Sequence, residues 1–158
     1  MWVLIRAVTY ASLFIGFVLV FLPARVLSWT GIAAIPAVGV WQVFGMMVSG
    51  AGTAIALWCI LTFVFLGKGT PAPFDPPRRL VVRGPYRIVR NPMYVGAGLA
   101  LAGAALFYTS IPLLTYAGLF GLVTHGFVVA YEEPTLRRTF SNDYEVYCGH
   151  VGRWWPKL

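Results

Sequence analysis

The sequence predicts an all-α integral membrane protein with about four transmembrane helices and a C-terminal amphipathic cytoplasmic helix. Of its 158 residues, 59% are hydrophobic and only 11% are charged, and the mean hydropathy is +0.76. Soluble domains carry about 25% charged residues, so this composition excludes that class. No Asp, Glu, Lys or Arg occurs from residue 91 to residue 131, a stretch long enough for two spans joined by a turn. The length predicts a single domain over residues 1–158.

The first apolar stretch, residues 2–22, is interpreted as a transmembrane helix that ends at Pro23. A cleaved signal peptide is the alternative, but Arg6 alone is a weak basic region and no small-residue cleavage site follows. Residues 26–40 contain two glycines and a proline, which predict an interfacial loop or a short half-buried helix. If this segment crossed the membrane instead, the protein would have five transmembrane helices.

Three further helices are predicted along the chain. Residues 41–66 form the second, the third starts at Pro92, and residues 112–131 form the fourth after a turn at residues 109–112. Asn91 suits the N-cap of the third helix, and proline suits its first position. Small residues recur in the second and third helices and predict close helix packing. They are Gly45, Ser49, Gly50, Gly52, Gly96, Gly98, Ala100, Ala102 and Gly103.

The net charge of +7 arises from basic residues in the segments beside the apolar helices. The positive-inside rule therefore places residues 67–90 and the C-terminal segment in the cytoplasm, facing anionic membrane lipids, and makes a nucleic-acid partner improbable. We expect an inner or plasma membrane protein whose functional site faces the cytoplasm. The two cysteines, Cys59 and Cys148, are too few for a disulfide framework or a metal site.

Two adjacent carboxylates, Glu132 and Glu133, follow the fourth apolar stretch. At the end of a helix they would oppose its dipole near the hydrocarbon boundary, so a cation is expected to compensate them. That cation is either Arg137 or Arg138, one turn further on, or a bound ligand. Pro134 is expected to turn Glu133 away from helical geometry.

An apolar stripe follows Pro134 at steps of four and three residues and predicts the amphipathic helix. This helix either lies on the bilayer or covers a site formed by the basic loop and the glutamates. Trp154 and Trp155 are expected to anchor its end at the membrane interface. The stripe consists of Leu136, Phe140, Tyr144, Tyr147 and Val151.

These motifs together resemble the superfamily of isoprenylcysteine carboxyl methyltransferases and phospholipid methyltransferases, membrane enzymes that use S-adenosylmethionine. The resemblance covers about residues 78–156 and rests on Leu80-Val81, Gly84, Tyr86, Arg90 to Gly96, the glutamate pair and the stripe. It implies that ten residues bind the cofactor. They are Arg78, Arg79, Leu80, Val81, Tyr86, Asn91, Pro92, Met93, Tyr94 and Glu132.

The physical chemistry of these residues agrees with that assignment. A helix N-terminus at Asn91 suits the cofactor's carboxylate, a glutamate suits its cationic groups, and aromatic and aliphatic walls suit its adenine. Two positions depart from the prenylcysteine enzymes. Asn91 replaces the usual histidine, and Val128 stands where those enzymes place an arginine thought to meet the substrate carboxyl. The phospholipid enzymes also allow asparagine at the first position, and Tyr131-Glu132-Glu133-Pro134 looks more like them than like the prenylcysteine enzymes.

The resemblance therefore implies an S-adenosylmethionine-dependent methyltransferase for a lipidic acceptor, either a phospholipid amine or an isoprenylcysteine-like carboxylate. An ammonium acceptor must lose a proton before it attacks, whereas a carboxylate attacks directly. His125 and Glu133 are the candidate catalytic residues. His125 lies seven residues before Glu132, on the same face of a regular helix, and is either a packing residue or a group that orients or deprotonates an amine.

Two other functions remain open at this point. The chain could be a small membrane scaffold subunit without enzymatic activity, or a reductase that binds NADPH, because membrane sterol reductases share the C-terminal arrangement. Measuring the binding of S-adenosylhomocysteine and of NADPH distinguishes the methyltransferase, the scaffold subunit and the reductase. No feature of the sequence indicates an oligomeric state.

Overall fold

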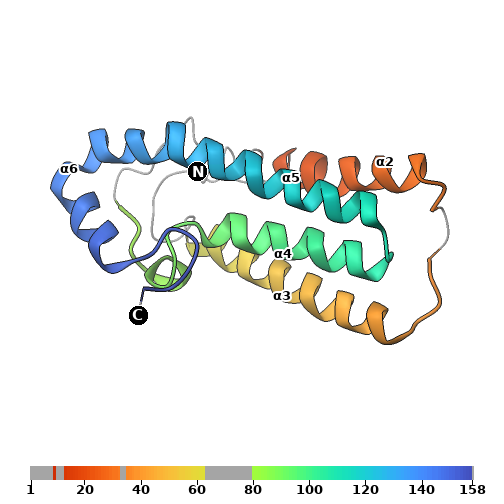
Figure 1. Ribbon diagram of the computed structural model, residues 1–158. Helices are drawn as coiled ribbons and strands as arrows, with labels where there is room; N and C mark the ends of the chain where they lie inside the picture. Colours follow the sequence, from red (N-terminus) through yellow and green to blue (C-terminus); the bar gives the residue numbers. More distant parts are fainter. Residues whose placement is uncertain (1–8, 10–12, 33–34, 63–79, 158) are drawn as a thin grey trace.

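The computed structural model describes residues 9, 13–32, 35–62 and 80–157, and all regular structure in these residues is helical. Long helical segments run side by side along one axis, and the C-terminal residues lie at one end of the molecule beside the segment that precedes α4 (Figure 1). The elements, in chain order, are the π-helix η1 (Ile15–Phe21), α2 (Leu22–Trp29), α3 (Val40–Thr62), the 3₁₀-helix η3 (Gly84–Arg87), α4 (Pro92–Phe107), α5 (Ile111–Phe127), the π-helix η4 (Val128–Glu132) and α6 (Glu133–His150).

Helices α3 and α4 pack backbone against backbone through their glycines. A Cβ atom added at Gly45 or Gly52 would lie 2.5 Å from a backbone nitrogen of α4, and one at Gly96 would lie 2.7 Å from the Gly52 carbonyl oxygen. The Ser49 hydroxyl adds a hydrogen bond to the Ala100 carbonyl at 3.1 Å. The prediction of a small-residue packing face is thus confirmed for these residues, whereas Gly50 and Gly98 face open space.

The fourth predicted helix does not end at Tyr131. Helices α5, η4 and α6 form one continuous helical run in which Glu133 has helical dihedral angles, φ −61° and ψ −45°. The expectation that Pro134 would turn Glu133 out of the helix was wrong. A proline lacks an N–H and its ring clashes with the carbonyl four residues earlier, and the wider π-helical turn in front of Pro134 accommodates both effects.

The first helix shows the same arrangement. The π-helix η1 precedes Pro23, and α2 then continues to Trp29 instead of ending at the proline as expected. About half of the predicted stretch 2–22, residues 2–8 and 10–12, lies outside the described residues. Residues 30–32 and 35–39 are not helical, so the described residues hold no fifth helix in the 26–40 segment. Helix α3 begins at Val40, close to the prediction, and the expected end at residue 66 is also outside the described residues.

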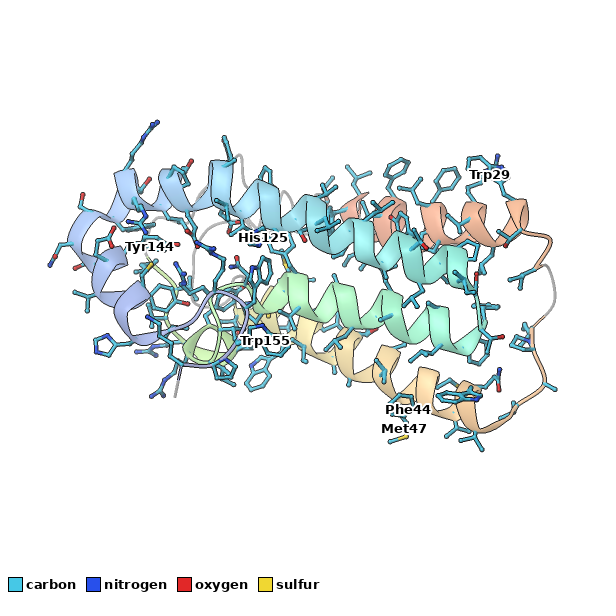
Figure 2. The ribbon with its side chains drawn as sticks, in the orientation of Figure 1. Trp29, Phe44, Met47, His125, Tyr144 and Trp155 are labelled. Carbon is cyan, nitrogen blue, oxygen red and sulfur yellow. The ribbon has the colours of Figure 1, made fainter. Side chains whose placement is uncertain are left out.

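Two helices of the described residues are long and apolar enough to cross a membrane, Val40–Thr62 and the run Ile111–His150. The apolar helices Ile15–Trp29 and Pro92–Phe107 are shorter. Large apolar side chains such as Phe44 and Met47 project outward from α3 (Figure 2). These findings agree with association with a membrane, while four complete spans stay a prediction.

The chain bends sharply within α6 at Ser141, which has φ 42° and ψ −116°. After the bend, the apolar stripe faces the protein: Tyr144, Tyr147 and Val151 form a buried cluster. Leu80, Leu136 and Phe140 pack against this cluster. The stripe therefore covers the segment before α4 instead of being left free for a lipid surface.

Candidate functional site

The Tyr94 hydroxyl donates a hydrogen bond to Glu132 Oε2 at 3.3 Å. Tyr94 lies in the first turn of α4, whose first residue is Pro92, and Glu132 is the last residue of η4. The contact therefore joins the start of one apolar helix to the end of the next. The sequence predicts this arrangement as two spans joined by a turn. Within the described part of the chain, no Lys or Arg forms an ion pair with Glu132.

An apolar wall lies next to this contact. Val81 and Tyr86 are buried together with Cys59 of α3, and Met93 packs against them. Burial raises the pKa of Tyr86 well above its ordinary value, and the neighbouring Cys59 thiol and Glu132 carboxyl raise it further. The Tyr86 hydroxyl is therefore protonated at neutral pH. Three of the residues predicted to bind the cofactor are thus brought together beside Glu132.

Asn91 precedes α4 at the N-cap position, with Pro92 at the first helical position, which confirms the predicted helix start. The expected side-chain cap does not form. Instead, Asn91 Nδ2 donates a hydrogen bond to the Arg153 carbonyl oxygen at 3.2 Å. Because the side chain does not cap the helix, the first N–H groups of α4 retain their capacity to bind an anionic group.

The remaining predicted binding residues divide into two sets. Leu80 packs against the Tyr144 cluster, on the other side of the segment from Val81. Arg78 and Arg79 lie outside the described residues, so their predicted role stays a prediction.

Glu133, in contrast to Glu132, is neutralised by two arginines. Arg153 Nε donates to its Oε1 at 2.6 Å and a second guanidinium nitrogen donates to its Oε2 at 2.8 Å. Arg90 lies 3.1 Å from Oε1 of the same carboxylate, whose side chain is only 7% exposed. Such a bidentate pair is a strong, directional contact.

The cations that compensate Glu133 are therefore Arg90 and Arg153 instead of the expected Arg137 or Arg138. Arg137 pairs with Glu145 at the protein surface instead of with either glutamate. Sequence reasoning missed Arg153, and its separation of 20 residues from Glu133 offers no local signal. The catalytic role assigned to Glu133 stays a prediction, although both of its oxygens already accept hydrogen bonds from arginine.

His125 pairs with the C-terminal segment. The Trp154 indole Nε1 donates to His125 Nδ1 at 3.0 Å, and the two rings lie 6.0 Å apart. The expectation that His125 shares a face with Glu132 assumed a regular α-helix, and the π-helical residues between them remove that premise. His125 contacts Trp154, whereas Glu132 contacts Tyr94. With Nδ1 accepting, Nε2 carries the proton of a neutral His125.

The arrangement suits a ligand that has both a cationic and an anionic group. Glu132 offers a carboxylate, the α4 N-terminus offers N–H groups, and Tyr86 and Val81 offer an apolar wall. Among the described residues, no group of three His, Cys, Asp or Glu side chains is placed to hold a metal ion. An organic ligand is the ligand class that this site fits.

The fold is that of a membrane-associated helical protein with an acidic and aromatic site at one end of an apolar helical bundle. The family model described as phospholipid methyltransferase matches residues 40–143, about two thirds of the chain. The chain therefore belongs to the phospholipid methyltransferase family and is a methyltransferase. The match begins at α3 and ends within α6, so it includes Tyr94, Glu132 and Glu133. Neither a curated protein nor a solved structure matches the chain.

Proposed function

We propose that this protein transfers the methyl group of S-adenosylmethionine to a lipidic acceptor drawn from the bilayer, with a phospholipid amine favoured over a prenylcysteine carboxylate. The cofactor enters from the cytoplasm, and the acceptor reaches it between the apolar helices. The observation that carries the proposal is the position of Glu132. This carboxylate lies beside Tyr94 and near Tyr86, and in the described residues it forms no ion pair with Lys or Arg.

Each described residue of the site has a role in binding. Glu132 attracts a cationic part of the cofactor, and the Tyr94 hydroxyl fixes the direction of that carboxylate. The apolar wall around Tyr86 and Val81 suits a flat aromatic base, and the N-terminus of α4 suits a carboxylate. Bound S-adenosylmethionine would supply an electrophilic methyl group on a sulfonium. The protein then has to align the acceptor with that group and exclude water.

An amine acceptor also needs a partner for its proton. His125 is exposed and its Nδ1 accepts the Trp154 hydrogen bond, so the Nε2–H of the neutral ring can donate to an oxygen of the acceptor lipid but cannot take the amine's proton. In this arrangement His125 orients the acceptor, and it takes up a proton only after the Trp154 bond breaks. Glu133 is less available because Arg90 and Arg153 hold it.

Calorimetric titration of the purified protein with S-adenosylhomocysteine tests the proposal. We expect saturable heat with S-adenosylhomocysteine and none with NADPH in the same experiment. Saturation by NADPH alone would support a reductase, and the absence of both signals would support a scaffold subunit. Labelled methyl transfer to a total membrane extract, followed by identification of the labelled product, then names the acceptor class.

A further inference from the structure

The residues after α6 turn back and pair with the segment that leads into α4. Val89 and Gly152 form a parallel β-bridge, and the Arg90 N–H donates to the Gly152 carbonyl oxygen at 2.8 Å. Gly152 is buried, and a Cβ atom there would overlap the carbonyl oxygen of Trp155. We call residues 151–157 the C-terminal strap. Its backbone is fixed next to the start of α4, the helix whose first turn contains Tyr94, the partner of Glu132.

Three consecutive residues of the strap bind three different parts of the site. Gly152 binds Arg90, the Arg153 side chain binds Glu133, and the Trp154 indole binds His125. The Arg153 carbonyl also accepts the Asn91 hydrogen bond. The strap therefore connects the segment before α4, the start of α6 and the end of α5. It lies outside residues 40–143, the part of the chain that the family model matches.

The Arg153–Glu133 pair lies directly next to the site carboxylate. Glu133 is the first residue of α6, and Glu132 is the last residue of the π-helical segment. A π-helical turn is a rare local insertion that changes the rotation of the helix after it. The directions of the side chains that follow the turn therefore depend on the tertiary contacts that these side chains make. Because adjacent residues share one backbone, fixing the Glu133 carboxylate also fixes the direction in which Glu132 leaves the helix.

From this geometry we propose that Arg153 is a positioning residue of the cofactor site. Its two hydrogen bonds to Glu133 hold the η4–α6 junction in the rotation that directs Glu132 toward Tyr94, while its carbonyl holds Asn91. Arg153 itself does not touch the cofactor. This inference rests on the proposed function, because it specifies how the same site is kept in its binding geometry.

The test compares two arginine–glutamate pairs that both involve α6. Arg153→Gln removes the charge and one of the two hydrogen bonds to Glu133, whereas Arg153→Lys keeps the charge without the bidentate geometry. Arg137→Gln removes the surface pair with Glu145, in which the two side chains are 50% and 51% exposed, and serves as the matched control. We expect Arg153→Gln to weaken S-adenosylhomocysteine binding about tenfold, Arg153→Lys to lie between it and the wild type, and Arg137→Gln to change binding by less than about twofold.

A second measurement separates positioning from simple stabilisation. Hydrogen exchange of the peptide over residues 84–95 reports the Arg90 N–H that bonds Gly152. Under the proposal, exchange there is faster in Arg153→Gln, and saturating S-adenosylhomocysteine restores its protection. If Arg153→Gln is poorly folded, the double variant Glu133→Gln/Arg153→Gln removes both charges of the pair and is titrated in its place, with weakened binding still expected.

The binding measurements distinguish a failure of the proposed function from a failure of the positioning role of Arg153. A wild-type protein without saturable heat would overturn both the proposed function and this inference. If the wild-type protein binds S-adenosylhomocysteine and Arg153→Gln binds it with the same affinity, only the inference is overturned. The double variant replaces Arg153→Gln in this comparison if Arg153→Gln is poorly folded. Weaker binding by Arg153→Gln with partial recovery in Arg153→Lys supports the positioning role, because a loss of stability alone lowers the unfolding temperature without changing the affinity of the folded protein.

Discussion

The Tyr94 hydroxyl and the Glu132 carboxylate meet at 3.3 Å, although the two residues are 38 positions apart in the chain. One stands at the start of α4 and the other at the end of the π-helical segment after α5. Because α4 and α5 are antiparallel and joined by a short turn at Tyr108 to Ser110, both ends return to the same end of the bundle (Figure 1). The site is thus a direct consequence of hairpin closure.

We predict that Glu132 contributes more to cofactor affinity than any other single side chain. Glu132→Gln keeps the shape of the side chain and removes its charge. Hydrogen bonds to charged groups contribute about 1.5–3 kcal/mol, so the affinity for S-adenosylhomocysteine should fall roughly tenfold to a hundredfold. Calorimetry on folded, monodisperse protein measures this loss. Glu145→Gln, at an exposed position of α6, is the control and should bind as the wild type does. Wild-type affinity in Glu132→Gln would show that the cofactor binds elsewhere.

Tyr94→Phe should also lower the affinity for S-adenosylhomocysteine, but by less than Glu132→Gln does. The change removes the donor that orients Glu132 while the ring remains, which corresponds to about 1 kcal/mol, or roughly fivefold in affinity. In the Glu132→Gln background the same change should matter less, because the two residues act as a pair. Tyr131→Phe is the matched control: its ring stacks on Phe127 at 5.3 Å and is 45% exposed. Full additivity of Tyr94→Phe and Glu132→Gln would argue against a shared role.

Alanine substitutions at Gly52 and Gly98 should differ in their effect on stability. Gly52→Ala places a methyl group 2.5 Å from the backbone of α4, and overpacking of this kind costs about 1–3 kcal/mol. Gly98→Ala meets open space, so its main effect is the better helix propensity of alanine, about 1 kcal/mol. Thermal unfolding in detergent should therefore give a lower midpoint for Gly52→Ala and an unchanged or higher one for Gly98→Ala. Equal midpoints would contradict the close packing of α3 on α4.

Residues 67–90 and the C-terminal segment should lie on the same, cytoplasmic side of the membrane. The Val89–Gly152 bridge places parts of both segments together, and their basic residues suit the cytoplasmic face. Cysteines introduced at Arg87 and Lys157, in a Cys148→Ser background that keeps the buried Cys59, should react with an impermeant maleimide only in inverted vesicles. A cysteine at Thr30, the C-cap residue of α2, should react in intact cells, because α2 ends at the end of the bundle opposite the C-terminus (Figure 1). Labelling of Arg87→Cys from outside intact cells would reject this topology.

The protein should not strongly prefer a free prenylcysteine carboxylate. Val128 occupies the position of the arginine expected in such enzymes, and at 1% exposure it has neither a charge nor access to a substrate. A bidentate contact to a carboxylate is therefore absent at this position. Methyl transfer to vesicles that contain an ethanolamine phospholipid should be faster than transfer to a farnesylated cysteine analogue. Faster turnover of the analogue than of every membrane lipid tested would reverse this preference.

The sequence predicted several features of the fold because they depend on composition and local chemistry. Long uncharged stretches predicted the apolar helices, and Asn91-Pro92 marked the start of α4. The small residues predicted close helix packing, because only residues without large side chains allow two backbones to approach so closely, and the structure shows that α3 and α4 are the partners. Two spans joined by a turn predicted that Glu132 lies within reach of the start of α4, whereas the hydrogen bond between Glu132 and Tyr94 was not predicted.

Only the tertiary structure decided how the two glutamates differ. By local pattern alone Glu132 and Glu133 are two adjacent carboxylates with the same nearest cations, Arg137 and Arg138, and only the family resemblance assigns them different roles. The π-helical turn before Pro134 keeps the helix continuous and directs the two carboxylates to different partners, Tyr94 for Glu132 and two arginines for Glu133. One of those arginines, Arg153, comes from the C-terminal strap, whose return depends on the bend at Ser141 and on burial of the apolar stripe. A local pattern fixes which residues form a helix, but the partner of a buried charge depends on the rotation of that helix and on distant segments that fold back to it.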